Sequence, residues 1–191
     1  ASGGRFDARL TDTQTLMGTA ELYAAHAADT TVTGSESVEN DARGASLNLV
    51  WSHQYADTGS TELRLAYTGY RRDYPTLYRE VRDTVDLQGQ WSTRLAARHQ
   101  ITAGLGYRRS RDETGGPPRA IIFTPADRSI DQPSAFVQDR VTLWQDRLTL
   151  TVGSKFEHND FTGYEVQPGV RIGLKTDNGY FWSSASRAVR T

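Results

Sequence analysis

The sequence has 191 residues, of which 37% are hydrophobic, and its 22 Lys and Arg nearly balance its 23 Asp and Glu. Because the positive and negative residues are interspersed, nothing favours nucleic acid as a partner. Cysteine is absent, which excludes a disulfide framework, a thiolate metal site and a cysteine nucleophile. No stretch approaches 18 consecutive apolar residues, which excludes a helical membrane span but not a barrel strand, since a barrel strand needs only about 9–11 residues with every second one apolar.

Ten segments alternate apolar and polar residues with the period of a β-strand, and no comparable stretch fits a helix. In TELRLAYTGY, which begins at Thr61, one face carries Leu63, Leu65 and Tyr67, and the other carries Glu62, Arg64 and Thr68. Segments 16–25 and 134–143 show no consistent apolar face. In chain order, we expect strands at about 5–10, 16–25, 45–56, 61–72, 78–94, 99–111, 134–143, 148–158, 165–175 and 180–188.

The connections between these segments differ in length at alternate positions. The first, third, fifth, seventh and ninth are short and polar, whereas the second, at about 25–44, and the sixth, at about 112–133, are long and polar. This pattern predicts an antiparallel up-and-down meander with one tight end and one end of longer loops. Outer-membrane barrels have short periplasmic turns and longer extracellular loops, so both ends of the chain are expected on the extracellular side.

A soluble all-β domain is the alternative to a membrane barrel, because alternation shows only that one face is buried. Three observations favour the barrel. Several strands approach ten residues, whereas soluble strands cluster at about 5–6; they run consecutively up and down; and aromatic residues fall near strand ends, as in interfacial girdles. These aromatic residues are Tyr55, Tyr67, Tyr70, Tyr78, Trp91, Tyr107, Trp144, Phe156, Tyr164, Tyr180 and Trp182.

The polar face of such strands lines an aqueous lumen or faces a plug, since lipid cannot solvate it. The charged and amide side chains on that face are therefore expected to point inward. They are Arg64, Asp86, Gln88, Arg108, Lys155, Glu157 and Arg171.

The sixth connection holds the candidate substrate-binding residues. It opens with a GGPP motif, continues with the apolar stretch IIF, and contains Arg119 and Arg128. One interpretation is a mobile surface loop. The functional interpretation is an extracellular loop that captures substrate, with both arginines available to an anionic ligand such as a ferric chelate.

Two segments of the chain carry a resemblance to a known family. They read QPSAFVQDRVTLWQDRLTLTVGSKFEHNDFTGYEVQPGVRIGL and FWSSASRAVRT. In this order they resemble the barrel of TonB-dependent receptors; the resemblance covers about residues 83–191, and residues 1–82 match in architecture only. Ser186, Arg187 and Arg190 in the second segment mark the family, and we expect them to serve barrel structure rather than ligand chemistry.

The resemblance implies that residues 1–191 form a partial barrel domain, truncated at both ends, of a barrel with about 22 strands and a plug. It also implies a place in the bacterial outer membrane and active import of a scarce nutrient, by default a ferric siderophore, with energy from TonB. The implied partners are outer-membrane lipid, the TonB–ExbB–ExbD complex through the plug region, and a small-molecule substrate such as a metal chelate.

Two other functions stay open on the sequence. A passive porin-like barrel would have no plug, and a barrel enzyme would lose its activity on replacement of His158 or His26. We expect no catalytic, metal or cofactor site, because the histidines show no metal-ligand spacing and no GxSxG motif occurs. The four histidines are His26, His53, His99 and His158.

Overall fold

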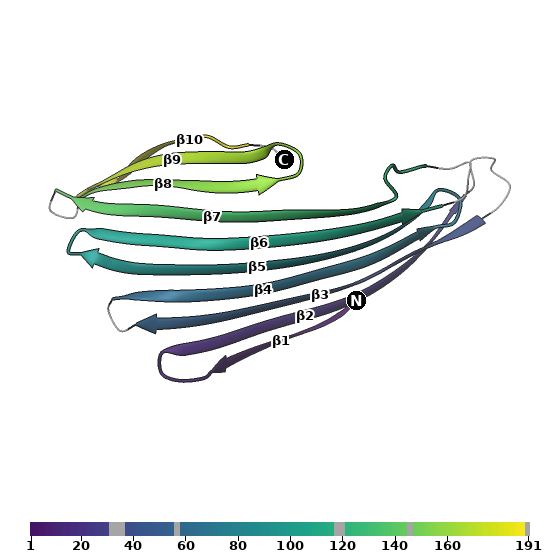
Figure 1. Cartoon of the computed structure of the whole chain (residues 1–191). Helices are drawn as coiled ribbons and strands as arrows, with labels where there is room; N and C mark the ends of the chain where they lie inside the picture. The colour runs from purple at the N-terminus through teal and green to yellow at the C-terminus, as the bar shows by residue number, and fades with distance from the viewer. Residues whose placement is uncertain (31–36, 56–57, 117–120, 145–146, 190–191) are drawn as a thin grey trace.

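The protein is described by a computed structural model that covers residues 1–30, 37–55, 58–116, 121–144 and 147–189. It consists of ten β-strands in one antiparallel sheet, in which every strand pairs with the next one along the chain (Figure 1). The predicted all-β meander of ten strands is confirmed. The strands are β1 (Ser2–Arg9), β2 (Gln14–Thr30), β3 (Ser37–Tyr55), β4 (Gly59–Tyr74), β5 (Tyr78–Ala96), β6 (His99–Gly115), β7 (Asp127–Leu143), β8 (Leu148–Asn159), β9 (Gly163–Thr176) and β10 (Gly179–Ser186).

The odd-numbered connections lie at one end of the sheet and the even-numbered ones at the other (Figure 1); the longest, between β6 and β7, lies at the even-numbered end, although the connections 75–77 and 160–162 there are as short as the turns opposite. We call these the tight-turn end and the loop end. The odd-numbered connections, beginning with the one between β1 and β2, lie at the tight-turn end. Within the described residues, β1 pairs with β2 alone and β10 with β9 alone, so the sheet is open at both edges.

Several strands extend further toward the loop end than the alternation predicts. Strand β2 continues to Thr30 and β3 begins at Ser37, although 25–44 is predicted to be one connection. Likewise, β6 ends at Gly115 and β7 begins at Asp127 inside the predicted connection 112–133. The reason is that large apolar side chains no longer alternate along these ends, so the backbone pairing continues where the hydrophobic pattern has stopped.

The sheet has no conventional hydrophobic core. Val50, at 8% exposure, is the one buried apolar side chain among the described residues. Large apolar side chains are instead exposed along one face, with Leu105 at 72%. An apolar surface of this extent marks a face that contacts lipid or protein, which favours the membrane barrel over the soluble all-β alternative. The described part of the chain contains no helix with the length and hydropathy of a membrane span.

The exposed apolar side chains form a continuous outer band, and its middle is a shallow hollow of about 500 Å³. On β3 the band extends from Leu47 to Tyr55, which corresponds to roughly 20–27 Å once strand tilt is allowed for and matches the apolar band of an outer-membrane barrel. The outward side chains that line the hollow come from four neighbouring strands: Trp51, Leu63, Leu65, Leu87, Leu105 and Tyr107.

Tyrosines mark the upper limit of this band on two strands. The Tyr67 hydroxyl donates to Asp83 at 2.6 Å, and the Tyr107 hydroxyl donates to Asp131 at 2.5 Å. Beyond them the outward positions carry ion pairs, such as Asp73 with Arg79 at 2.7 Å. Since charges on a lipid-facing surface are costly, the strand ends beyond Tyr67 and Tyr107 lie outside the membrane.

The inner face is polar, and the seven side chains predicted to point inward all lie on it. All seven line one of two hollows on this face. Lys155 and Arg171 line the first, and the other five line the second. The strand register also assigns the two segments whose faces the sequence leaves open. In β2, Leu16, Gly18, Ala20 and Leu22 face outward; in β7, Ala135, Val137, Asp139, Val141 and Leu143 face outward.

Four of the predicted girdle aromatics are placed wrongly by the sequence. Tyr70, Tyr78, Tyr180 and Trp182 lie on the inner face, where their register partners are Arg82, Tyr74, Lys175 and Gly173. The physical reason is that an aromatic ring inside a lumen also packs over a glycine, as Tyr180 does over Gly173, or against a guanidinium: that of Arg171 lies 4.9 Å from the Trp182 ring centroid. An aromatic residue near a strand end can serve either for such packing inside the lumen or for interfacial anchoring, and its place in the sequence does not show which.

Candidate substrate-binding site

A network of charged and aromatic side chains covers the inner face of β4–β6 at the loop end, beyond the apolar band. Arg82 binds Asp112 on β6 with two hydrogen bonds, the Nη2 to Oδ2 one at 3.0 Å. The Tyr70 hydroxyl donates to Glu80 at 2.7 Å, and the Arg72 guanidinium lies 4.6 Å from the Tyr70 ring centroid. Burial and then the hydrogen bond to Glu80 raise the pKa of Tyr70 to about 12, so the hydroxyl stays a neutral donor.

Arg128, a predicted candidate, lies at the start of β7 in this same region. It is paired in register with Asp112, and its guanidinium lies 4.4 Å from the ring centroid of Phe161 in the β8–β9 turn. Arg128 therefore connects the inner-face network to a second loop. A guanidinium above an aromatic ring retains donors for an anion, because the ring occupies its face and leaves its edge open.

Three aromatic rings lie at the tip of the β4–β5 hairpin. Tyr74 and Tyr78 stack with centroids 5.2 Å apart, and Phe123 meets Tyr78 edge-on at 5.6 Å. The backbone N–H of Ile121 donates to the carbonyl of Leu77 at 3.2 Å, which holds this part of the sixth connection against the hairpin. A hollow of about 500 Å³ adjoins the rings and includes Arg79.

We call the combined surface the mouth cluster. Because the strands are in register, its members follow one another in rows from the hairpin tip down the inner face. Its chemistry is that of a recognition surface: guanidinium donors for an anion and flat rings for an aromatic or conjugated ligand. The mouth cluster comprises Tyr70, Arg72, Tyr74, Tyr78, Glu80, Arg82, Asp112, Phe123, Arg128 and Phe161.

The sequence anticipates only part of the mouth cluster. Arg128 is brought into it, whereas Arg119 and Arg190 lie outside the described residues. Arg72, Glu80 and Arg82 are missed, although the polar alternation of their strands continues past Tyr67 and could have indicated them. Of the family-marker residues, Ser186 closes β10 opposite Gly169, and the Arg187 guanidinium lies 3.4 Å from Glu165.

The histidines form no converging site in the described part of the chain, which contains no group of three His, Asp or Glu side chains able to hold a metal ion. His26 pairs with Asp41 on the outer face, and the rings of His158 and Tyr164 have centroids 4.6 Å apart. These two histidines, which the barrel-enzyme alternative would require, lie on different hairpins.

The fold defines a class: a segment of β-barrel wall with a lipid-facing band, a polar inner face and, beyond the band, a cluster of arginines and aromatic rings. The sequence model of the family described as TonB dependent receptor-like, beta-barrel, matches residues 2–191. The chain therefore belongs to this family, and its place is the bacterial outer membrane. No curated protein sequence matches the chain.

Solved receptor structures share the fold at low sequence identity. The siderophore receptor PirA from Pseudomonas aeruginosa has a TM-score of 0.76 at 14% identity, over 96% of this chain and 31% of that one. A mutant of the ferric enterobactin receptor PfeA from the same organism gives 0.73 at 19%, over 92% and 31%. The alcaligin outer-membrane receptor FauA from Bordetella pertussis gives 0.71 at 17%, over 96% and 34%. The chain thus spans about a third of the length of these receptors.

Proposed function

We propose that this chain is part of the wall of an outer-membrane transporter that imports a ferric siderophore with energy from TonB. Family membership supports the transporter class, and the solved proteins of similar fold include receptors for siderophores and ferric enterobactin. The observation that carries the proposal is the mouth cluster, in which arginines and aromatic rings share one surface above the apolar band.

The chemistry of the mouth cluster suits an anionic ferric chelate. Such a chelate presents negative oxygen atoms, which guanidinium groups bind with charge-assisted hydrogen bonds, and organic arms that pack on aromatic rings. We assign Arg128 to the substrate-binding surface for this reason. Arg119 belongs to the same connection, and we propose that it serves the same ligand.

Residues 1–191 form a partial barrel domain; lipid surrounds its outer band, and TonB–ExbB–ExbD acts through a plug region of the receptor. The strands supply the wall and the loops supply capture, so no covalent chemistry and no enzyme activity are involved. We propose that Ser186, Arg187 and Arg190 fix the end of the tenth strand.

The test is binding of ferric catecholate and ferric hydroxamate chelates to the whole receptor in detergent, measured by quenching of intrinsic fluorescence. Arg128→Gln removes the charge above Phe161 and is expected to raise the Kd of the bound chelate about fivefold to tenfold, the range of an aromatic-stacked arginine at a binding surface.

Arg111→Gln is the matched control, because Arg111 lies on the outer face and pairs with Glu113 at 2.7 Å; its Kd is expected to stay unchanged. Absence of saturable binding by either chelate class, together with passive conductance of the purified protein, would contradict the transporter proposal and favour the porin-like alternative.

A further inference from the structure

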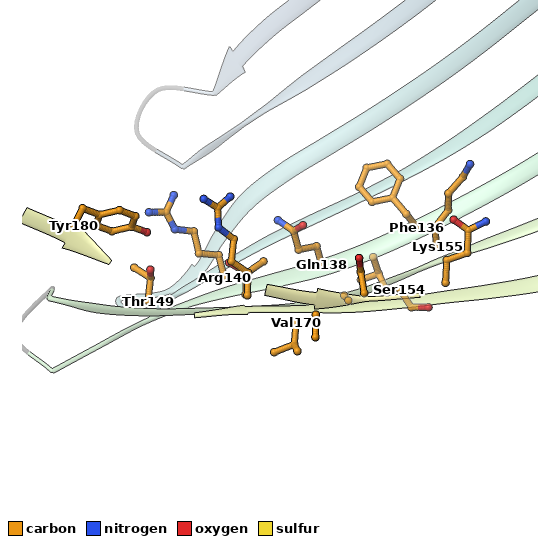
Figure 2. Close-up of a pocket in the computed structure, with 16 residues that line it drawn as sticks. Phe136, Gln138, Arg140, Thr149, Ser154, Lys155, Val170 and Tyr180 are labelled. Atoms are coloured by element: carbon orange, nitrogen blue, oxygen red, sulfur yellow. The ribbon is translucent and has the colours of Figure 1, made fainter. Parts of the chain in front are cut away.

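The outer face at the loop end carries charges that the transport proposal does not use. Figure 2 shows that the sheet separates its side chains by face: Gln138, Arg140 and Lys155 rise on one side, and Val170 points to the other. The side of Val170 is the outer face, which carries the apolar band. Beyond this band, two neighbouring strands each present an arginine on the same outer face.

Arg43 of β3 and Arg71 of β4 are direct register partners. Both point outward, because each lies four residues beyond an outward side chain of its own strand, Leu47 or Tyr67. Arg43 is exposed, and the side chain of Arg71 is 39% exposed. Like charges directly opposite each other in neighbouring strands destabilise a sheet, so the pair favours an anion bound between its two guanidinium groups.

The row of the sheet that holds this pair supplies no acid to it. On its other side Arg43 has Ala24 as register partner, and Arg71 has Val81. Within the strands that the structure describes, no other two basic residues are register partners. The arrangement is therefore specific to this place on the wall.

The acids of the next row outward are held by other cations. Asp73 lies 2.7 Å from Arg79 but 4.0 Å from Arg71, and Asp41 contacts the His26 ring. Both acids lie two residues further from the apolar band than the arginines. The side of the arginine pair that faces the band is thus left open to an anion.

Small residues separate the arginine pair from the apolar band. Ala45 and Gly69 are register partners between the two. The Tyr67 hydroxyl lies over Gly69 and donates to Asp83, the acid beside these small residues, at 2.6 Å. The result is a low shelf, which extends about 13 Å along the strands from the arginine row to the row of Leu47 and Tyr67. Arginine stems can lie along such a surface while their charged ends stay at the polar boundary.

We propose that Arg43 and Arg71 bind the phosphate of a lipid head group in the outer leaflet, with the acyl chains of that lipid on the apolar band. Short turns of such barrels lie on the periplasmic side, so the loop end faces the outer leaflet. The lipids of that leaflet carry phosphates on sugar head groups, and the shelf gives the sugar room. Guanidinium groups bind phosphate with charge-assisted, often bidentate, hydrogen bonds. The proposal depends on the outer-membrane location and not on transport.

The probe is lipid A, whose sugar head group carries two phosphates, added to the whole receptor refolded in neutral detergent. Native mass spectrometry gives the Kd of the first bound molecule. Arg43→Gln and Arg71→Gln should each raise this Kd about fivefold to tenfold, the range for losing one charged contact to a phosphate. Dephosphorylated lipid A should bind the wild-type receptor as weakly as lipid A binds the variants. Inorganic phosphate in large excess should not displace lipid A, because it has no acyl chains.

Arg72→Gln is the matched control, because it removes the same charge from the next residue of β4, which faces inward over the Tyr70 ring. Its Kd for lipid A is expected to equal that of the wild type. Arg71→Gln should leave chelate binding unchanged. Without lipid, Arg71→Gln should also unfold in urea no more easily than the wild type, because it removes a like-charge repulsion.

Equal Kd values for lipid A in the wild type and in both outward variants would overturn the proposal, as would an equal rise in Arg72→Gln. Tight binding of dephosphorylated lipid A would show that phosphate is not recognised, and displacement by inorganic phosphate would assign the pair to a soluble anion; either result overturns the lipid site. Easier unfolding of lipid-free Arg71→Gln would contradict the like-charge argument. Failure of the chelate-binding test at the mouth cluster leaves the Kd for lipid A unaffected, so the two proposals fail separately.

Discussion

Asn159 shows how a single buried polar side chain positions part of the mouth cluster. Its side chain is fully buried, and its Oδ1 accepts hydrogen bonds from the backbone N–H groups of Phe161 and Thr162, both at 2.9 Å. Its Nδ2 donates to the Thr162 hydroxyl at 2.8 Å. This Asx turn fixes the β8–β9 hairpin, and thereby the ring of Phe161 against Arg128.

Replacing Asn159 by alanine should therefore affect both stability and binding. Loss of its hydrogen bonds leaves backbone donors unsatisfied, and we expect the free energy of unfolding to fall by about 1–3 kcal/mol. Urea unfolding in micelles measures this, and chelate binding should weaken in parallel as Phe161 loses its place. Asp160→Ala, an exposed change in the same turn, is the control, and an equal loss of stability there would contradict the assignment.

At the scale of the strand, the sequence predicts the segments in which lipid contact requires alternating apolar side chains. It does not predict the polar strand ends. Ten strands are recovered because each crosses the apolar band and must alternate there. Large apolar side chains stop alternating toward the loop end, so the polar ends of β2, β3, β6 and β7 look like loops although they pair. Asp139 obscures the outward face of β7, and the structure accounts for it by a contact with His99 Nδ1 at 2.7 Å.

The two faces of one strand pair should respond oppositely to the same substitution. Leu105 lies in the middle of the outer band at 72% exposure, so Leu105→Arg puts a charge into lipid and should cost about 2–4 kcal/mol. Gln88→Arg, on the inner wall of the neighbouring strand, should cost under about 1 kcal/mol, since it faces the aqueous lumen. Reversible unfolding from lipid vesicles compares the two. A smaller cost for Leu105→Arg than for Gln88→Arg would contradict the assignment of faces.

At the scale of the whole molecule, the sheet has two surfaces with different solvents. Its outer surface leaves leucine, valine and tryptophan exposed, and its inner surface holds arginine, glutamine and acidic groups in paired and unpaired sets. An open sheet exposes unpaired backbone groups along its first and last strands, which a membrane does not tolerate. In the bilayer, the unpaired backbone groups of β1 and β10 therefore need hydrogen-bond partners.

The candidate site could be predicted from the sequence only in outline. The sequence predicts Arg128 because this residue lies among loop-like residues, and the alternation predicts the inward set from Arg64 to Arg171. The partners of Arg128 were not, because Asp112 and Phe161 come from other strands and a turn, and their proximity depends on register. Arg140 lies in segment 134–143, whose face the alternation does not assign. The sequence therefore does not predict the inner-face hollow that Arg140 and Arg171 line.

The most direct test of the central claim, a lipid-facing wall with projecting strand ends, is a nitroxide scan of β6 in the whole receptor reconstituted in bilayers. The chain contains no cysteine. A variant with a single cysteine at one position from Gln100 to Thr114 therefore has one labelled site in this chain. Collisions with oxygen should peak at Ile101, Ala103 and Leu105 and fall at the positions between them. A water-soluble nickel chelate should reach the outward labels only beyond Tyr107, at Arg109, Arg111 and Glu113. Oxygen collisions without this alternation, or nickel access along the whole outward face, would contradict the account.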